Sequence, residues 1–123
     1  MSKKILFVIG LVILAIIIAG FYFYNKPVVP ASGKYDDFAK CLASKKITMY
    51  GAVWCSHCQN EKNSFEGSFK YVSYVECPDN IQLCLDKGIE AYPAWIFPDN
   101  KKLVGEQGLE KLSQESSCPL PLQ

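Results

Sequence analysis

The pattern of hydrophobic and polar residues divides the chain into two unlike parts. Residues 5–24 form an uncharged run of 20 residues that is rich in Ile, Leu and Val. As a helix rising ~1.5 Å per residue, this run would span ~30 Å, the hydrocarbon thickness of a bilayer. We therefore expect a cytoplasmic start at residues 1–4, a transmembrane anchor at residues 5–24, a linker at residues 25–34 and a folded domain at residues 35–123.

A cleaved signal peptide is the alternative for the apolar run. Lys3 and Lys4 would be its basic start, and residues 29–31 a cleavage site. The apolar part of a signal peptide is usually only ~7–15 residues long. Residues 21–24 also place aromatic rings where a membrane interface would lie. The run therefore favours an uncleaved anchor. On either interpretation the lysines keep the N-terminus in the cytoplasm, and the domain lies on the periplasmic or extracellular side.

Beyond residue 34, stretches with helical spacing of apolar residues alternate with short β-rich runs. The predicted helices cover residues 35–46, 59–69, 81–87 and 109–116, and the predicted strands cover residues 47–50, 71–75, 94–97 and 102–104. This order predicts an α/β fold in which one mixed sheet of four strands is covered by helices on both faces. We expect parallel pairing where a helix separates two strands, and an antiparallel hairpin at the end.

Charge excludes one class of function for the domain. The chain has 13 Lys, 12 acidic residues and no Arg, and two of the lysines precede the apolar run. Nucleic-acid binding needs clustered basic charge, which a nearly neutral domain without Arg does not supply. We therefore expect no nucleic-acid partner.

Cysteine use fits an oxidising compartment. All six cysteines lie in the predicted domain, and they are Cys41, Cys55, Cys58, Cys77, Cys84 and Cys118. Six cysteines are many for a reducing cytosol but ordinary for an exported protein. They can pair in fifteen ways, and spacing alone does not choose among them.

The pair within Trp54-Cys55-Ser56-His57-Cys58 is the strongest candidate for chemistry, because it follows a strand and begins a helix. A helix N-terminus favours the thiolate of Cys55, which is the reactive form. Cys58, one turn later, could resolve a mixed disulfide and should be the more buried sulfur. His57 between them would stabilise the Cys55 anion and so make the disulfide a stronger oxidant, unless it simply faces water.

Two other interpretations of the pair are open. Zinc could bind Cys55, Cys58, Cys77 and Cys84, although six residues separate the second two and a zinc ribbon has two short, similar knuckles. The pair could instead be a structural disulfide in an exported binding domain. Tyr92-Pro93 favours catalysis over that view. A proline directly before a strand fits poorly unless its bond is cis, and we expect this loop to lie beside the sulfurs.

Three stretches carry a family resemblance: residues 50–59 (YGAVWCSHCQ), residues 74–77 (YVEC) and residues 88–95 (GIEAYPAW). Together they resemble the thioredoxin superfamily, and most closely the thioredoxin-like domain fused to bacterial vitamin K epoxide reductase homologues. The resemblance covers nearly all of residues 35–118. It implies a thioredoxin-like three-layer sandwich and a thiol–disulfide oxidoreductase, with Trp54, Tyr92 and Pro93 binding substrate.

The resemblance also implies partners and disulfides. The pair would oxidise exported protein thiols and be reoxidised by a quinone-linked membrane protein similar to vitamin K epoxide reductase. No cofactor or metal would be bound to the domain itself. Cys77 would pair with Cys84 and Cys41 with Cys118, both as structural disulfides. The chain has one apolar span where the fused homologues have a four-helix reductase, so we expect the partner to be a separate protein.

The most specific of these expectations concerns the direction of electron flow. Met49 stands where thioredoxins that act as reductants keep a buried Asp. The presence of Met49 fits an oxidant or a slow reductant better than a general disulfide reductase. The alternatives are an anchored reductant, for example in cytochrome c maturation, an isomerase, or a non-catalytic domain with all six cysteines in structural disulfides.

Overall fold

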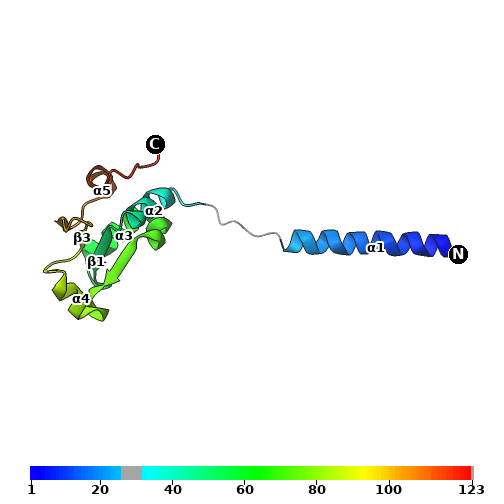
Figure 1. Ribbon diagram of the computed structural model, residues 1–123, viewed down its shortest axis with the longest axis horizontal. Helices are drawn as coiled ribbons and strands as arrows, with labels where there is room; N and C mark the ends of the chain where they lie inside the picture. Colours follow the sequence, from blue (N-terminus) through cyan, green and yellow to red (C-terminus); the bar gives the residue numbers. More distant parts are fainter. Residues whose placement is uncertain (26–31, 123) are drawn as a thin grey trace. The chain divides into compact units, whose positions relative to one another are not determined.

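The computed structural model describes residues 1–25 and 32–122, which form two separate units (Figure 1). The first is helix α1 (Lys3–Tyr24), whose 22 residues are all exposed. By length and mean hydropathy it is the one helix among the described residues that could cross a membrane. Its bounds enclose the predicted anchor at residues 5–24. Residues 26–31, which hold most of the predicted linker and the candidate cleavage site, lie outside the described residues.

The second unit begins at Ser32 and contains a four-stranded sheet. Its elements in chain order are α2 (Asp36–Ser44), β1 (Thr48–Gly51), α3 (Ser56–Ser64), the 3₁₀ helix η1 (Glu66–Tyr71), β2 (Ser73–Glu76), the 3₁₀ helix η2 (Cys77–Asp79), α4 (Ile81–Asp86), β3 (Ala94–Ile96), β4 (Lys102–Val104) and α5 (Leu109–Ser116).

The sheet is mixed, with strand order β2-β1-β3-β4. Strand β1 pairs parallel with β2 and antiparallel with β3, and β3 and β4 form the predicted hairpin. The predicted fold class is therefore confirmed. The expectation that strands separated by a helix pair in parallel is wrong for β3, which follows α4 but runs antiparallel to β1. A parallel connection must run back along the sheet, usually through a long helix. Helix α4 has only six residues, about 9 Å, so the chain crosses the end of β1 and returns in the opposite direction.

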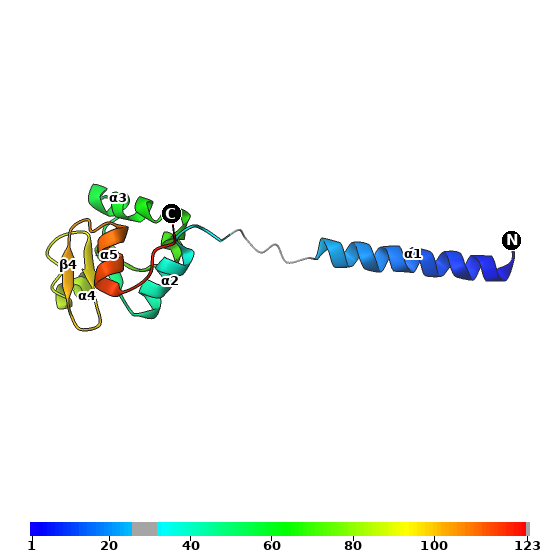
Figure 2. The same ribbon diagram turned by 90° about the horizontal axis from the view of Figure 1, so that it is seen from above.

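The two faces of the sheet bury different clusters. Met49 and Trp95 contribute to a core shared with α2, α3 and α5, whereas Tyr50 and Ile96 contribute to a second cluster with η2 and α4. This division follows from the period of two along each strand. Figure 1 accordingly shows α4 and α5 on opposite sides of β1 and β3, and Figure 2 shows the same domain from above. The result is three layers.

Two predicted boundaries shift around the cysteine pair. Helix α3 begins at Ser56 and ends at Ser64, whereas we predicted a helix over residues 59–69. Its early end has a local cause, because Glu66 has a positive φ of 52° and the chain continues as a 3₁₀ helix. That helix contains Tyr71, so β2 begins at Ser73, later than the predicted strand over residues 71–75.

Candidate active site

The cysteine pair lies where β1 passes into α3, as the sequence predicts. Cys55 is the N-cap of α3, in an extended conformation, and its sulfur accepts a hydrogen bond from the Cys58 backbone N–H at 3.2 Å. A cysteine at this position faces backbone N–H groups that have no partner within the helix. Both cysteines are thiols in the structure and are not joined to each other. They are therefore free for exchange chemistry.

The two sulfurs have different surroundings. Cys55 keeps 9% of its surface exposed, whereas Cys58 is fully buried. Burial raises the pKa of the Cys58 thiol to about 12, and the neighbouring Cys55 acts in the same direction. Because the thiolate is the nucleophile, this difference makes Cys55 the sulfur that an outside thiol or disulfide meets first. Cys58 is suited to a later, internal step.

His57 projects from the first turn of α3 and has a partner that the sequence analysis did not find. Its Nδ1 lies 2.6 Å from Oε1 of Glu106, which also accepts a hydrogen bond from the Asn60 side chain at 2.9 Å. These two contacts, that of His57 first, hold the pKa of Glu106 below its usual range. The His57 side chain remains 70% exposed. Glu106 lies 49 residues away, so no local pattern could have indicated it.

Trp54 and Tyr92 meet beside the pair, and the Tyr92-Pro93 bond is cis. Trp54 is 71% exposed, and its ring contacts the Tyr92 ring edge-on, with centroids 5.9 Å apart. The contact brings the loop before β3 against the turn that holds Cys55. Pro93 itself is buried, and its carbonyl accepts a hydrogen bond from Gly105. An exposed aromatic surface thus borders the cysteines on the side of this loop.

The other four cysteines form two disulfides. Cys41 is joined to Cys118 and Cys77 to Cys84, the pairing that the resemblance implies. The first links α2 to the segment after α5, and the second links η2 to α4. Cys77 and Cys84 therefore do not offer the free thiolates that the alternative zinc site would need.

Gly51, the last residue of β1, is required by close approach rather than by its backbone angles. A Cβ at this position would lie 2.9 Å from the Cys58 sulfur and 3.2 Å from the Tyr74 hydroxyl oxygen. Both atoms therefore stand over the same bare Cα. The nearness of Tyr74 to the buried sulfur is a second feature that the sequence analysis missed.

Replacing Gly51 with Ala should lower the free energy of unfolding by about 1–3 kcal/mol, because the added methyl group overfills a packed site. Gly67→Ala is the matched control, since a Cβ there would meet nothing within 4 Å. Urea titrations of both variants measure the effect. Equal midpoints for the two variants would contradict the assigned packing.

Glu61 is a buried carboxyl group on the inner side of α3, with 2% of its surface exposed. It accepts hydrogen bonds from the backbone N–H groups of Gln107 at 2.8 Å and Gly108 at 3.3 Å. Gly108 is the N-cap of α5. Glu61 therefore connects α3 to the start of α5. Its donor Gln107 directly follows Glu106, the partner of His57.

Burial raises the pKa of Glu61 above its usual value, although the backbone donors oppose the shift. A raised pKa in the folded state means that folding favours the protonated carboxyl. Its stabilising contribution is complete below the unfolded value of about 4.3 and is lost as the pH rises through the folded pKa. We therefore expect the stability of the wild type, relative to Glu61→Gln, to increase as the pH falls from 7 toward 4.5. Urea titrations of both proteins across this range test it, and a constant difference would contradict the raised pKa.

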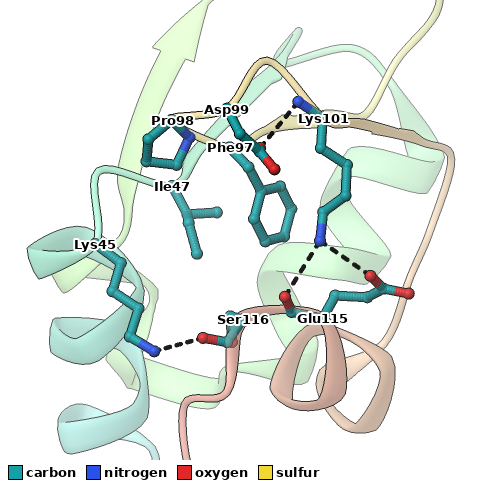
Figure 3. Close-up of a pocket in the computed structure, with 8 residues that line it drawn as sticks. All are labelled: Lys45, Ile47, Phe97, Pro98, Asp99, Lys101, Glu115 and Ser116. Atoms are coloured by element: carbon teal, nitrogen blue, oxygen red, sulfur yellow. Dashed lines mark hydrogen bonds and ion pairs between the residues drawn. The ribbon is translucent and has the colours of Figure 1, made fainter.

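A hollow bordered by α5 lies away from the cysteines. It measures about 420 Å³ and is floored by Ile47, just before β1, and Phe97, just after β3. Figure 3 shows Lys45 and Lys101 reaching over it to the last turn of α5, where their ammonium groups bond the backbone carbonyls of Ser116 and Glu115. Lysines at a helix C-terminus satisfy its unpaired carbonyls. The hollow is thus bordered by end contacts of α5, and none of the predicted site residues lines it.

The strand order, the cysteine at the helix N-cap and the cis proline before β3 together define a thioredoxin-like domain with a dithiol pair. The chain is 42% identical over 91 residues to the thiol-disulfide oxidoreductase LTO1 of Arabidopsis thaliana, a match covering 67% of this chain. It spans only 24% of that relative's length. Among solved structures, a thioredoxin of Malassezia sympodialis is 20% identical with a TM-score of 0.48, covering 76% of this chain and 96% of that one. No family model matches the sequence.

Proposed function

We propose that the protein is a membrane-anchored thiol–disulfide oxidoreductase that oxidises the thiols of exported proteins. The observation that carries the proposal is the Cys55–Cys58 pair, which is unbonded and lies at the start of α3. It combines a cysteine that keeps 9% of its surface exposed with one that is fully buried. The four remaining cysteines are already paired, so this dithiol is the part of the domain left to exchange electrons. The named activity of the Arabidopsis relative supports the same chemistry.

In the oxidising direction the working form carries a Cys55–Cys58 disulfide. A substrate thiolate attacks the Cys55 sulfur, a substrate–Cys55 bond forms, and the electron pair of the broken bond leaves on Cys58. A second substrate thiolate then attacks the substrate sulfur of the mixed disulfide and releases Cys55 as a thiolate. The substrate loses two electrons and gains a disulfide, and the pair takes up the two electrons and becomes a dithiol.

The surrounding residues fit this cycle. The Cys58 backbone N–H donates a hydrogen bond to the Cys55 sulfur, which is the atom that leaves in the second step. His57, whose ring is held by Glu106, is the catalytic side chain proposed between the two cysteines. The exposed Trp54 and the Tyr92-Pro93 loop would provide the surface on which a substrate segment lies, through aromatic and backbone contacts.

Helix α1 supports the proposed anchoring, with residues 1–4 in the cytoplasm and the domain on the extracytoplasmic side. An oxidant needs its disulfide restored. We assign that step to a separate quinone-linked membrane protein similar to vitamin K epoxide reductase, which would take the two electrons from the dithiol and pass them to quinone. The domain would then need no bound cofactor of its own.

Trapping of mixed disulfides tests the proposal. In Cys58→Ala no internal thiol can attack a mixed disulfide on Cys55, and only a second substrate thiolate can release it. Exported proteins that join Cys55 by thiol–disulfide exchange should therefore accumulate in disulfide linkage to it in cells. The matched control is the double variant Cys55→Ala/Cys58→Ala, which should trap none. If the single variant also traps none, the domain is a binding module rather than a thiol oxidoreductase.

A further inference from the structure

The buried sulfur of Cys58 raises a chemical difficulty for any exchange reaction. Opening the Cys55–Cys58 disulfide releases Cys58 as a thiolate, and closing it requires Cys58 to become one. The sulfur is fully buried, and its surroundings disfavour the charged form. A proton must therefore reach or leave this sulfur as the bond changes. Met49, on the buried face of β1, carries no acid–base group that could take it.

Tyr74 is placed to do so. It is the cross-strand partner of Met49 on β2. Its hydroxyl oxygen and the Cys58 sulfur both lie over the bare Cα of Gly51, within 3.2 Å and 2.9 Å of the same point. These two distances place the atoms no more than 6.1 Å apart, a separation that one bridging water can span.

Glu76 continues the path toward solvent. Its carboxylate oxygen Oε2 accepts a hydrogen bond from the Tyr74 hydroxyl at 2.5 Å, and Oε1 accepts one from the Val53 backbone N–H at 2.7 Å. Residues two apart on a strand share a face, so the carboxyl group lies directly beyond the phenol. Its fixed position results from contacts to β2 and to the cysteine turn at once.

We propose that Tyr74 and Glu76 form the proton route between the buried sulfur of Cys58 and solvent. The inference rests on the proposed exchange function of the pair and assigns two further residues to it. The Lys62 ammonium, which lies 3.7 Å from the centre of the Tyr74 ring, adds positive charge beside the route. A purely structural tyrosine would need its ring, which packs edge-on against Phe69, but not the hydrogen bond to Glu76.

The step balances as a proton transfer coupled to disulfide exchange. When Cys58 attacks a mixed disulfide on Cys55, its S–H proton passes through one bridging water to the Tyr74 oxygen while the phenol proton passes to Glu76. The Cys55–Cys58 bond forms, the bond from Cys55 to the outside sulfur breaks, and that sulfur leaves with the electron pair. In the opposite direction the same atoms return a proton to Cys58. Tyr74 and Glu76 are neither oxidised nor reduced.

Stopped-flow mixing of the reduced, full-length protein in detergent with excess dithiobis(nitrobenzoate) tests the route. Attack by Cys55 releases one coloured thiolate, and attack by Cys58 on the resulting mixed disulfide releases a second. Tyr74→Phe should leave the first phase unchanged and slow the second by about 100-fold, the lower range for general acid–base catalysis. Glu76→Gln should slow the same phase. Tyr71→Phe, whose ring contacts Lys40 and Lys70, is the matched control and should alter neither phase.

The pH profile of the second phase separates a proton route from a packing effect. Besides Tyr74 and Glu76, the ionisable groups that act on Cys58 are Cys55 and, from α3, Lys62. Without the route Cys58 must lose its proton to solvent, so the second phase of Tyr74→Phe should rise about tenfold per pH unit, more steeply than in the wild type. Second phases of equal rate and slope in Tyr74→Phe and wild type would overturn the inference. Failure of the wild type to release the second thiolate would instead overturn the proposed function.

Discussion

Replacing Cys41 and Cys118 together with Ala is expected to lower the free energy of unfolding of the domain by roughly 4 kcal/mol. The bond joins residues 77 positions apart, so it removes a large part of the freedom of the unfolded chain. It also attaches the segment after α5 to α2, where Cys118 belongs to the same core as Phe38 and Leu112. A small domain buries little hydrophobic surface, so its stability depends on such a link more than that of a large domain does.

Urea titration of the full-length protein in detergent measures this effect, with the fluorescence of the buried Trp95 as one signal. The double variant Cys77→Ala/Cys84→Ala provides the comparison, because its residues are only seven positions apart and the same relation gives about 2 kcal/mol. If the shorter bond proved the more important of the two, loop closure would not be the source of the stabilisation.

Cys55→Ser is expected to abolish single-turnover oxidation of a reduced, unfolded protein such as ribonuclease. The wild type, first oxidised at Cys55–Cys58, should transfer close to one disulfide per molecule, since one bond is exchanged for one. The variant cannot form the Cys55–Cys58 disulfide, and its serine oxygen cannot form a mixed disulfide. The fully buried Cys58 is out of reach of the unfolded substrate.

The control for this loss is the stability of the variant. Ser at the N-cap is among the residues that favour a helix start, so α3 should keep its N-cap and the urea midpoint should stay near that of the wild type. Residual transfer by Cys55→Ser at a rate close to that of the wild type would show that Cys55 is not the attacked sulfur.

The sequence was most informative where a feature depends on neighbouring residues. The turn at the cysteine pair, the hairpin through residues 98–101 and the helix before Gly88 all follow from local chemistry. The end of α3 did not, because a positive φ at Glu66 is an unusual choice that its residue type does not announce. The direction of β3 was also missed, because α4 is too short for a parallel return along the sheet, although the pattern predicted its length to within one residue.

The sequence predicted the two sulfurs of the candidate site but not the residues that support them. Cys55, Cys58, His57 and Trp54 are close in sequence, whereas Glu106 reaches His57 from a loop 49 residues away. By sequence Glu61 belongs to a polar helix, and nothing near it in the sequence indicates that it is buried. Its backbone donors come from Gln107 and Gly108, at the start of α5. Tyr74 and Glu76 gave one usable signal, since alternate positions on a strand share a face. The approach of Tyr74 to Cys58, however, depends on Gly51, which has no side chain between them.

The reduction potential of the Cys55–Cys58 pair tests the central claim most directly. The full-length protein in detergent would be equilibrated with glutathione buffers, the free thiols alkylated, and the mass shift of two groups followed, with Cys55→Ala/Cys58→Ala as the blank. A potential near or above about −200 mV is the result predicted for an oxidant of exported proteins. A potential near about −270 mV, as in reducing thioredoxins, would contradict it and assign the protein to the reductive direction.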